Sequence, residues 1–265
     1  MKTHIFLFVV CASLCPVEAQ WANYTTPNLP RTADGKPNLA APTPRTAAGK
    51  PDFSGLWEKT SNYGSNVASS LRPEDIQPWA QALVARRMED LGKDHMIPQC
   101  LPLGPGYITD GGTTAGGIVK IIQTPTVVIF LGQDMTYRQI YMDGRALETA
   151  PNPSWMGYSV GHWEGDTLVV VSKNFKKWAL DDYHYTNADE FRWHSDAVTF
   201  TEKFAWKDAK TISYEIIVDD PKVFTKPWSQ MFEIVSKPEW DKDGLYEYVC
   251  EENNRCPGGL CAAGK

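Results

Sequence analysis

The sequence predicts a mainly β fold, an antiparallel up-and-down barrel or half-open clam with one amphipathic helix packed on it. Short runs in which apolar and polar residues alternate recur from residue 117 to residue 235, and this period of two is that of a strand. Turn sequences such as Asp143-Gly144 and Gly165-Asp166 separate consecutive runs, as they do in hairpins. A meander of hairpins must curl or close, because an open sheet leaves unpaired backbone groups at its edges.

The first 19 residues have the pattern of a secretory signal peptide. Lys2 gives a basic start, an apolar run follows from residue 5 to residue 14, and the small residue Ala19 ends a cleavage site. The apolar run is shorter than the about 20 residues that a membrane span needs. We therefore expect a secreted or periplasmic protein without a membrane anchor.

Three further segments follow the signal peptide. Residues 20–52 are expected to be a Pro-rich flexible leader, which contains the near repeat RTADGKPNL and RTAAGKPDF. Residues 53–250 suit a single β-barrel-like domain, and residues 251–265 suit a C-terminal tail looped by a disulfide. The net charge of −6 and the absence of a basic block argue against nucleic acid and anionic membranes as partners. A small organic molecule is the expected ligand, and the oligomeric state is left open.

The elements of the domain can be placed in order. DFSGLWEK predicts a short strand with Phe53, Gly55 and Trp57 on one face. The one helical stripe runs from Pro73 to Leu91, with acidic residues in its first turn. Eight more strands are expected, at residues 117–123, 126–132, 136–142, 157–164, 167–173, 197–206, 211–219 and 228–235.

The segment GYSVGHWEGDTLVVV predicts a hairpin in detail. A two-residue turn at 165–166 pairs Trp163 with Leu168 and His162 with Val169. Both faces of this hairpin then carry large apolar side chains, so its outer face needs a cover. We expect the helix to provide that cover.

The strand expected at 197–206 contains an acidic residue on its apolar face. Val198, Phe200, Phe204 and Trp206 occupy even positions, and Glu202 shares their parity. Two interpretations are open. Glu202 forms a buried ion pair with an inward Arg138 or Arg145, or it is an acid or base poised near neutrality inside a pocket.

Two more ionisable residues precede this strand. Continued backwards, the same parity places His194 and Asp196 on the inward face, at the mouth of the pocket, so His194, Glu202 and Asp196 are the candidate catalytic residues. Ser195 points to the opposite face from His194, so His194-Ser195-Asp196 does not predict a nucleophilic triad. No cofactor is expected. A metal is not expected either, although His162, His184 and His194 form the pool of ligands if one is bound.

Aromatic residues make up 12% of the chain, more than the interior of a barrel of this size needs. Some can face a ligand with their polar tips exposed to water. The candidate residues for substrate binding are Trp163, Tyr158, Arg145, Tyr141, His162 and Tyr214.

Four cysteines remain after removal of the signal peptide, and an exported protein favours disulfides between them. Of the possible pairings we favour Cys100 with Cys250 and Cys256 with Cys261, because CPGGLC can close a tight local loop. The alternative is a zinc site of four thiolates, which lacks paired C-x-x-C sequences here.

Several motifs together resemble a large family of exported bacterial proteins whose activity is not characterised. They are PDFSGLWE, CLPLG, RQIYMDGR, PSWMGYSVGHWEGDTLVVV, HSDAVTFTEKF, IIVDDPKVFTKPW and EYVCEENN, within residues 51–254. The resemblance implies one exported domain and a bridge between Cys100 and Cys250, and it carries over no catalytic residue. His162 stands where that family has Lys or Arg about as readily as His. The opening Gly55-Leu56-Trp57 is similar to the start of lipocalin-type barrels, an analogy of architecture.

Two classes of function follow from these observations. We expect an enzyme that performs cofactor-free acid–base chemistry, as a lyase, isomerase or hydrolase, on a small compound of plant or carbohydrate origin. The alternative is a secreted carrier that binds a small hydrophobic or aromatic ligand without changing it. A metal-dependent enzyme with His and Glu ligands is the third interpretation.

Overall fold

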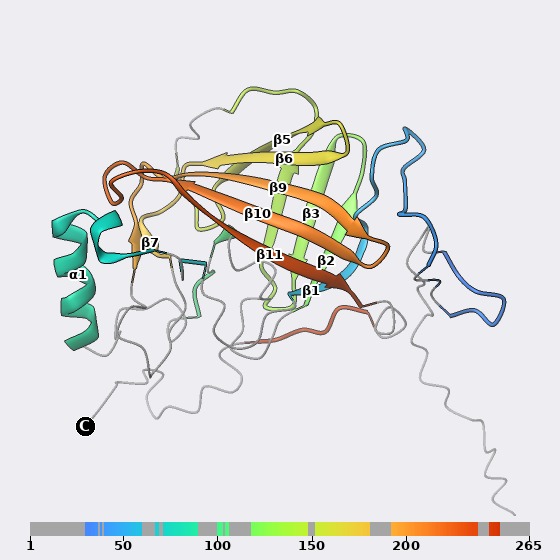
Figure 1. Cartoon of the computed structure of the whole chain (residues 1–265), viewed down its shortest axis with the longest axis horizontal. Helices are drawn as coiled ribbons and strands as arrows, with labels where there is room; N and C mark the ends of the chain where they lie inside the picture. The colour runs from blue at the N-terminus through green and yellow to red at the C-terminus, as the bar shows by residue number, and fades with distance from the viewer. Residues whose placement is uncertain are drawn as a thin grey trace, which may run out of the picture.

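A computed structural model describes residues 30–36, 38, 40–59, 67–68, 71–89, 100–102, 104–105, 118–147, 152–180, 192–237 and 244–249. Nine strands close into a barrel in the order β1-β11-β10-β9-β6-β5-β4-β3-β2, which confirms the predicted mainly β barrel (Figure 1). The strands are β1 (Gly55–Lys59), β2 (Ile118–Gln123), β3 (Val127–Gly132), β4 (Tyr137–Tyr141), β5 (Tyr158–Glu164), β6 (Thr167–Lys173), β9 (Thr199–Asp208), β10 (Thr211–Asp219) and β11 (Trp228–Ser236).

The barrel departs from a simple up-and-down meander in two places. β4 and β5 pair in parallel, so the expectation of sequential antiparallel hairpins is wrong there. The chain between β4 and β5, residues 142–157, is long enough to return β5 to the same end of the barrel. A second departure is a small two-stranded sheet of β7 (Trp178–Ala179) and β8 (Trp193–His194), inserted between β6 and β9.

Large side chains fill the inside of the barrel. Along β9 and β10 the buried positions alternate with partly exposed ones, as a strand with one inward face requires. Tyr214 stacks between Phe204 and Phe232, with ring centroids 4.7 and 6.0 Å apart, and Phe130 contacts Phe204 from the opposite wall. The centre of the barrel is therefore packed, and a ligand needs another entrance than its axis.

The hairpin of β5 and β6 has the predicted register, with Trp163 opposite Leu168 and His162 opposite Val169. The predicted position of the helix over this hairpin is wrong. A single turn of 3-10 helix (Pro73–Asp75) and α1 (Pro78–Glu89) lie at one end of the barrel instead (Figure 1). The backbone N–H of Gln77 donates to the Val223 carbonyl at 2.8 Å, and Trp79 Nε1 donates to the Lys222 carbonyl at 2.8 Å. Among the described residues of the predicted stripe, Trp79 alone is exposed to solvent, and the others are buried or partly buried: Ile76, Ala80, Leu83, Val84 and Met88.

The two copies of the leader repeat fold in the same way. Gly35 N donates to the Thr32 carbonyl at 2.8 Å, and Gly49 N donates to the Thr46 carbonyl at 2.9 Å. Both glycines have a positive φ, which an ordinary side chain rarely adopts. The second copy contacts the barrel through Arg45, whose guanidinium donates hydrogen bonds to both carboxylate oxygens of Asp166 in the β5–β6 turn. A defined contact thus links this part of the predicted flexible leader to the domain.

Several predictions fall outside the described residues. These are the signal peptide at 1–19, His184, the tail at 251–265, and Cys250, Cys256 and Cys261. Cys100 is described, but the proposed disulfide pairings stay predictions. Within the described residues, no helix has the length and apolar character needed to cross a membrane.

Candidate functional site

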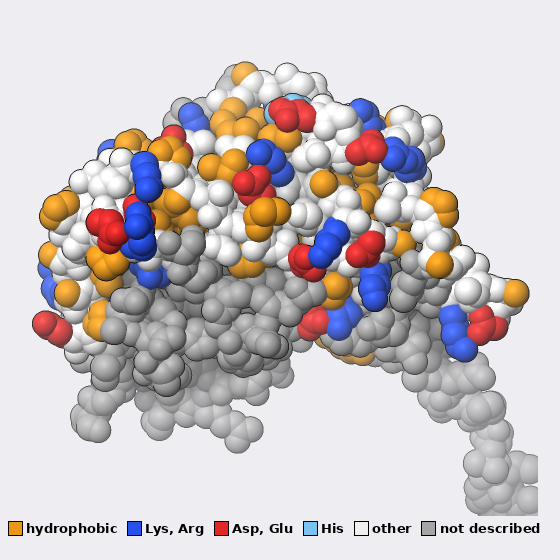
Figure 2. Space-filling view, viewed as in Figure 1, with side chains coloured by type: hydrophobic (Ala, Val, Ile, Leu, Met, Phe, Trp, Pro, Cys, Tyr) orange, Lys and Arg blue, Asp and Glu red, His pale blue; other side chains and the backbone are white. Residues whose placement is uncertain are grey.

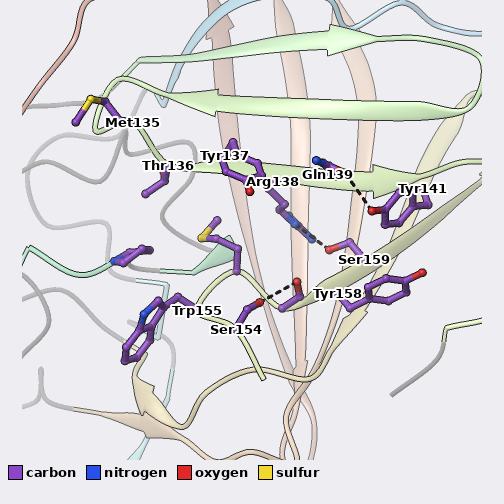
Figure 3. A pocket seen from close by; sticks show the side chains of 13 residues that line it. Met135, Thr136, Tyr137, Arg138, Gln139, Tyr141, Ser154, Trp155, Tyr158 and Ser159 are labelled. Atoms are coloured by element: carbon purple, nitrogen blue, oxygen red, sulfur yellow. Dashed lines mark hydrogen bonds between the residues drawn. The ribbon is translucent and has the colours of Figure 1, made fainter. Parts of the chain in front are cut away.

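A pocket of about 460 Å³ opens in the barrel wall between β4 and β5 (Figure 3). Its walls are mostly aromatic and apolar side chains, and its base is formed by polar side chains that point into the barrel. The lining residues are Pro102, Met135, Thr136, Tyr137, Arg138, Gln139, Tyr141, Ser154, Trp155, Met156, Gly157, Tyr158 and Ser159.

The pocket exists because β4 and β5 pair over a short distance. Ile140 lies opposite Ser159 and Tyr141 lies opposite Val160, and the chain before β5 then turns away from β4. That chain is held from the other side, because Ser154 N donates to the Asn174 carbonyl at 3.1 Å. The strands therefore part over the first half of β4, and the gap becomes a slot in the barrel wall.

Gly157 allows the turn that forms the lower edge of the slot. Its φ is +66°, and a Cβ built on it would lie 2.4 Å from the Phe175 ring and 2.8 Å from the Lys173 carbonyl oxygen. No side chain fits at this distance, so the close approach of the 154–157 segment to the end of β6 requires glycine.

Aromatic rings and basic side chains form the two ends of the slot. Tyr141 and Tyr158 lie side by side at one end (Figure 3), with ring centroids 5.4 Å apart. The Arg145 guanidinium lies 3.8 Å from the centroid of the Tyr141 ring. At the other end the ammonium of Lys176 lies over the Trp155 ring, 4.5 Å from the ring centroid. Each aromatic end thus has a cation stacked on it.

Arg145 is also an ion-pair partner. Its Nη2 lies 2.5 Å from Asp143 Oδ2, and this hydrogen-bonded carboxylate is the main cause that raises the pKa of Arg145, with Tyr158 second. The same contact lowers the pKa of Asp143. Both groups are charged at neutral pH, and the positive charge of Arg145 is balanced locally.

The base of the slot belongs to a buried polar network inside the barrel. Arg138 Nη1 donates to Glu202 Oε1 at 2.9 Å, and Arg138 Nη2 donates to Glu202 Oε2. Arg138 Nε donates to Ser159 Oγ at 3.1 Å, and Nη2 also donates to Ser172 Oγ at 2.7 Å. Tyr214 OH donates to Glu202 Oε1 at 2.9 Å. Burial, followed by the charge of Glu202, raises the pKa of Tyr214 well above its usual value, so this hydroxyl stays protonated.

This network explains the acidic residue on the apolar face of β9. The Glu202 side chain is 0% exposed, and its buried charge is compensated by the bidentate Arg138. Of the two interpretations from the sequence, the ion pair is confirmed, with Arg138 and not Arg145 as the partner. Whether Glu202 also takes part in a reaction stays a prediction.

The other two candidate catalytic residues do not converge on Glu202. His194 is buried at the end of β8, where its ring lies edge-on to Phe175 and Phe200 and its Nδ1 is 3.1 Å from the Ser195 carbonyl oxygen. Burial lowers the pKa of His194. Asp196 points outward with its side chain 62% exposed, and Lys222 Nζ binds it at 2.7 Å.

The expected inward direction of Asp196 is therefore wrong. The chain turns at residues 196–197, before β9 begins, so the alternation of β9 does not extend back to this residue. The turn is fixed by Asp220, whose buried carboxylate accepts the backbone N–H of Ser195 at 2.5 Å and its hydroxyl at 2.8 Å.

Three of the six candidate binding residues lie at the pocket, and the other three lie elsewhere. Tyr141 and Tyr158 line the pocket, and Arg145 stacks on Tyr141. Trp163 instead packs against Phe53, 5.9 Å between centroids, and Tyr214 lies inside the barrel. His162 is exposed on β5, where its Nε2 is 3.2 Å from Glu164 Oε1.

Sequence reasoning missed most of the pocket. Met135, Thr136 and Ser154 were not candidates, and Trp155 was an aromatic residue without an assigned role. The long connection between the 136–142 and 157–164 runs was the available signal, since neighbouring strands of a meander are joined by short turns.

The described residues include no group of three or more His, Cys, Asp or Glu side chains that could hold a metal ion. His162 is exposed on β5, His194 is buried, and His184 is outside the described residues. What the pocket offers is flat apolar surface at both ends and hydrogen-bond donors at its base. The family resemblance stays a prediction, because comparisons with protein-family models, with curated proteins and with solved structures found no match.

Proposed function

We propose that this protein binds a small aromatic molecule in the slot between β4 and β5. The observation that supports this function is the combination of two aromatic ends, Tyr141 with Tyr158 and Trp155, in one pocket of about 460 Å³. Small-molecule sites have volumes of roughly 300–1,000 Å³ and few polar groups on apolar walls. A flat ring between aromatic side chains gains stacking energy and buries apolar surface.

Hydrogen-bonding groups at the base of the slot can orient such a ligand. Arg138 has five N–H groups, and four of them donate to Glu202, Ser159 and Ser172. The remaining hydrogen, on Nη1, has no acceptor among the described residues. Arg138 lines the pocket, so we infer that a ligand ring with an oxygen substituent, which can accept this hydrogen, suits the pocket best.

Binding without chemistry uses fewer assumptions than catalysis by Glu202. Oε1 already accepts two hydrogen bonds and Oε2 accepts one, all from groups inside the barrel. A carboxylate in this arrangement would have to abandon a buried ion pair to accept a proton from a substrate. We therefore place the protein as an exported carrier, secreted or periplasmic, with the export inferred from the pattern of its first residues.

The direct test is a titration with a fluorescent aromatic probe such as naphthylacetamide. Trp155→Leu should weaken its binding about tenfold, because the aromatic end of the slot is lost. Trp79→Leu is the matched control, since Trp79 is exposed on α1 and does not line the pocket. Equal affinities of the wild type and Trp155→Leu would reject the pocket as the site. Mass spectrometry of small molecules that copurify would identify the natural ligand.

Acid–base catalysis is the second candidate, and one observation favours it. Arg138 and Ser159 line the pocket and also belong to the hydrogen-bond network of Glu202. One side chain, that of Arg138, therefore separates a ligand in the slot from the Glu202 carboxylate. Glu202→Gln should then leave affinity within about tenfold and lower turnover several hundredfold. Incubation of the copurified ligand with wild-type protein, followed by mass analysis, decides the question. An unchanged ligand would exclude the enzyme.

A further inference from the structure

We propose that the ligand of this slot is an aromatic anion whose acidic group is held by Lys173 and Lys176 at the edge of the pocket. This inference rests on the proposed function, because it assigns a charge to the aromatic ligand. It follows from the balance of charges around the slot, from the positions of the two lysines, and from a contrast with the opposite face of the barrel.

Among the described residues that line the slot none is acidic, and the one charged side chain is Arg138, which Glu202 neutralises. Arg145 at the tyrosine end is neutralised in the same way by Asp143. Asp134 lies near Met135, but its carboxylate is turned back to Thr136, which donates from N at 3.1 Å and from Oγ1 at 2.6 Å. Burial raises the pKa of Asp134, and its hydrogen bonds from Thr136 oppose that shift.

The charges of Lys173 and Lys176 are not balanced within the described residues, where neither ammonium has an ion-pair partner. Both lysines are close to the slot. Lys176 stacks on Trp155, and its backbone N–H donates to the Ser154 carbonyl at 2.9 Å. Lys173 is the cross-strand neighbour of Tyr158. Among the described residues, the pocket edge formed by β6 and the segment after it therefore carries a net positive charge.

The face of β9, β10 and β11 shows that this arrangement is not general. There basic and acidic side chains lie next to one another (Figure 2). Lys203 pairs with Glu215 at 3.1 Å, and Lys207 pairs with Glu233. The whole chain has a net charge of −6, so a cationic edge on its pocket runs against the average. Such a local field attracts anions to the pocket and repels cations.

The charge and the aromatic walls together select one class of ligand. An inorganic anion would leave the aromatic ends uncovered, and an aromatic cation would face two unbalanced ammonium groups. A ring with a carboxylate can stack at Trp155 or Tyr158 and place its acidic group at the lysines. The ion pairs would be exposed, so each is worth a small factor in affinity.

The test compares three naphthalene probes of similar size: naphthylacetate, naphthylacetamide and naphthylethylamine. At low salt we expect the acid to bind about three- to tenfold more tightly than the amide, and the amine to bind most weakly. Added salt should reduce the advantage of the acid, because exposed charges are screened. Lys176→Gln should reduce it as well. Lys226→Gln is the matched control, since it removes one positive charge beside Asp75, away from the slot.

The possible failures are distinguishable. Equal binding of the acid and the amide, both sensitive to Trp155→Leu, would overturn the anion preference and keep the aromatic pocket. An equal effect of Lys176→Gln and Lys226→Gln would remove the assigned role of Lys176. If none of the three probes binds, the proposed function fails and this inference fails with it.

Discussion

Two parts of the same barrel wall are built differently. β9 and β10 pair from Thr199 to Asp219, and their inward residues are packed. β4 and β5 are registered at two residue pairs, and a pocket occupies the gap where they part. Arg138 on β4 and Glu202 on β9 join the two parts across the interior. The fully paired β9–β10 wall therefore stabilises the barrel. The short contact between β4 and β5, which we call the seam, leaves polar groups accessible that the barrel otherwise encloses.

The largest predicted effect comes from breaking the connection between the two walls. Glu202→Leu leaves the Arg138 charge buried without a carboxylate, and we expect a loss of about 3–5 kcal/mol in the free energy of unfolding. Arg138→Met combined with Glu202→Leu removes both charges and should recover at least half of that loss. Urea denaturation measures both variants. A double variant less stable than Glu202→Leu would show that the uncompensated charge of Arg138 does not cause the loss in the single variant.

The second prediction concerns the edge of the seam. Gly157→Ala places a Cβ against Phe175 at a positive φ, and we expect a loss of about 2–4 kcal/mol together with weaker probe binding. Gly144→Ala is the control for backbone strain alone, since Gly144 also has a positive φ, +78°, but has no atom within 4 Å of its Cβ position. Thermal unfolding and probe titration measure the pair. Equal losses for both variants would mean that the seam tolerates the clash.

The third prediction uses His194, at the end of the inserted β7–β8 sheet. Burial lowers its pKa below the usual 6.5, so the unfolded chain binds a proton more readily than the folded one. Stability from this group is complete above pH 6.5 and falls as the pH drops below it, by up to about 1.4 kcal/mol per pH unit. His194→Gln should flatten this slope in denaturation curves between pH 7.5 and 5.5. His162→Gln is the matched control, since it removes an exposed imidazole.

Local pattern was sufficient to predict most of the barrel. The runs at 167–173 and 211–219 coincide with β6 and β10, and the register of the β5–β6 hairpin follows from its two-residue turn. Period-two alternation and turn chemistry are properties of a few consecutive residues, so they can be read without the rest of the chain.

What was missed depends on contacts between distant segments. The alternation within the runs at 136–142 and 157–164 does not show whether the two strands pair in parallel. The pocket results from their short parallel pairing. The predicted inward direction of Asp196 was wrong because Asp220, far along the chain, fixes the turn before β9. Parity indicated that Glu202 needs a cation, but the choice between Arg138 and Arg145 depends on how β4 faces β9 across the barrel.

The smallest predicted effect is the difference in stability between removing the hydroxyl of Ser159 and removing that of Ser172. Ser159 and Ser172 are 2.8 Å apart and both accept a hydrogen bond from Arg138, but Ser159 lines the pocket and Ser172 does not. Ser172→Ala leaves a donor unsatisfied in the packed interior, which costs about 1–2 kcal/mol.

Ser159→Ala exposes the same guanidinium from the pocket side, where a water molecule can replace the lost oxygen, so its cost should be smaller by about 1 kcal/mol. Urea denaturation of both variants gives the difference. Equal costs would mean that water does not reach Arg138 through the slot. The slot would then end above the network, and Arg138 could not orient a ligand through its remaining N–H.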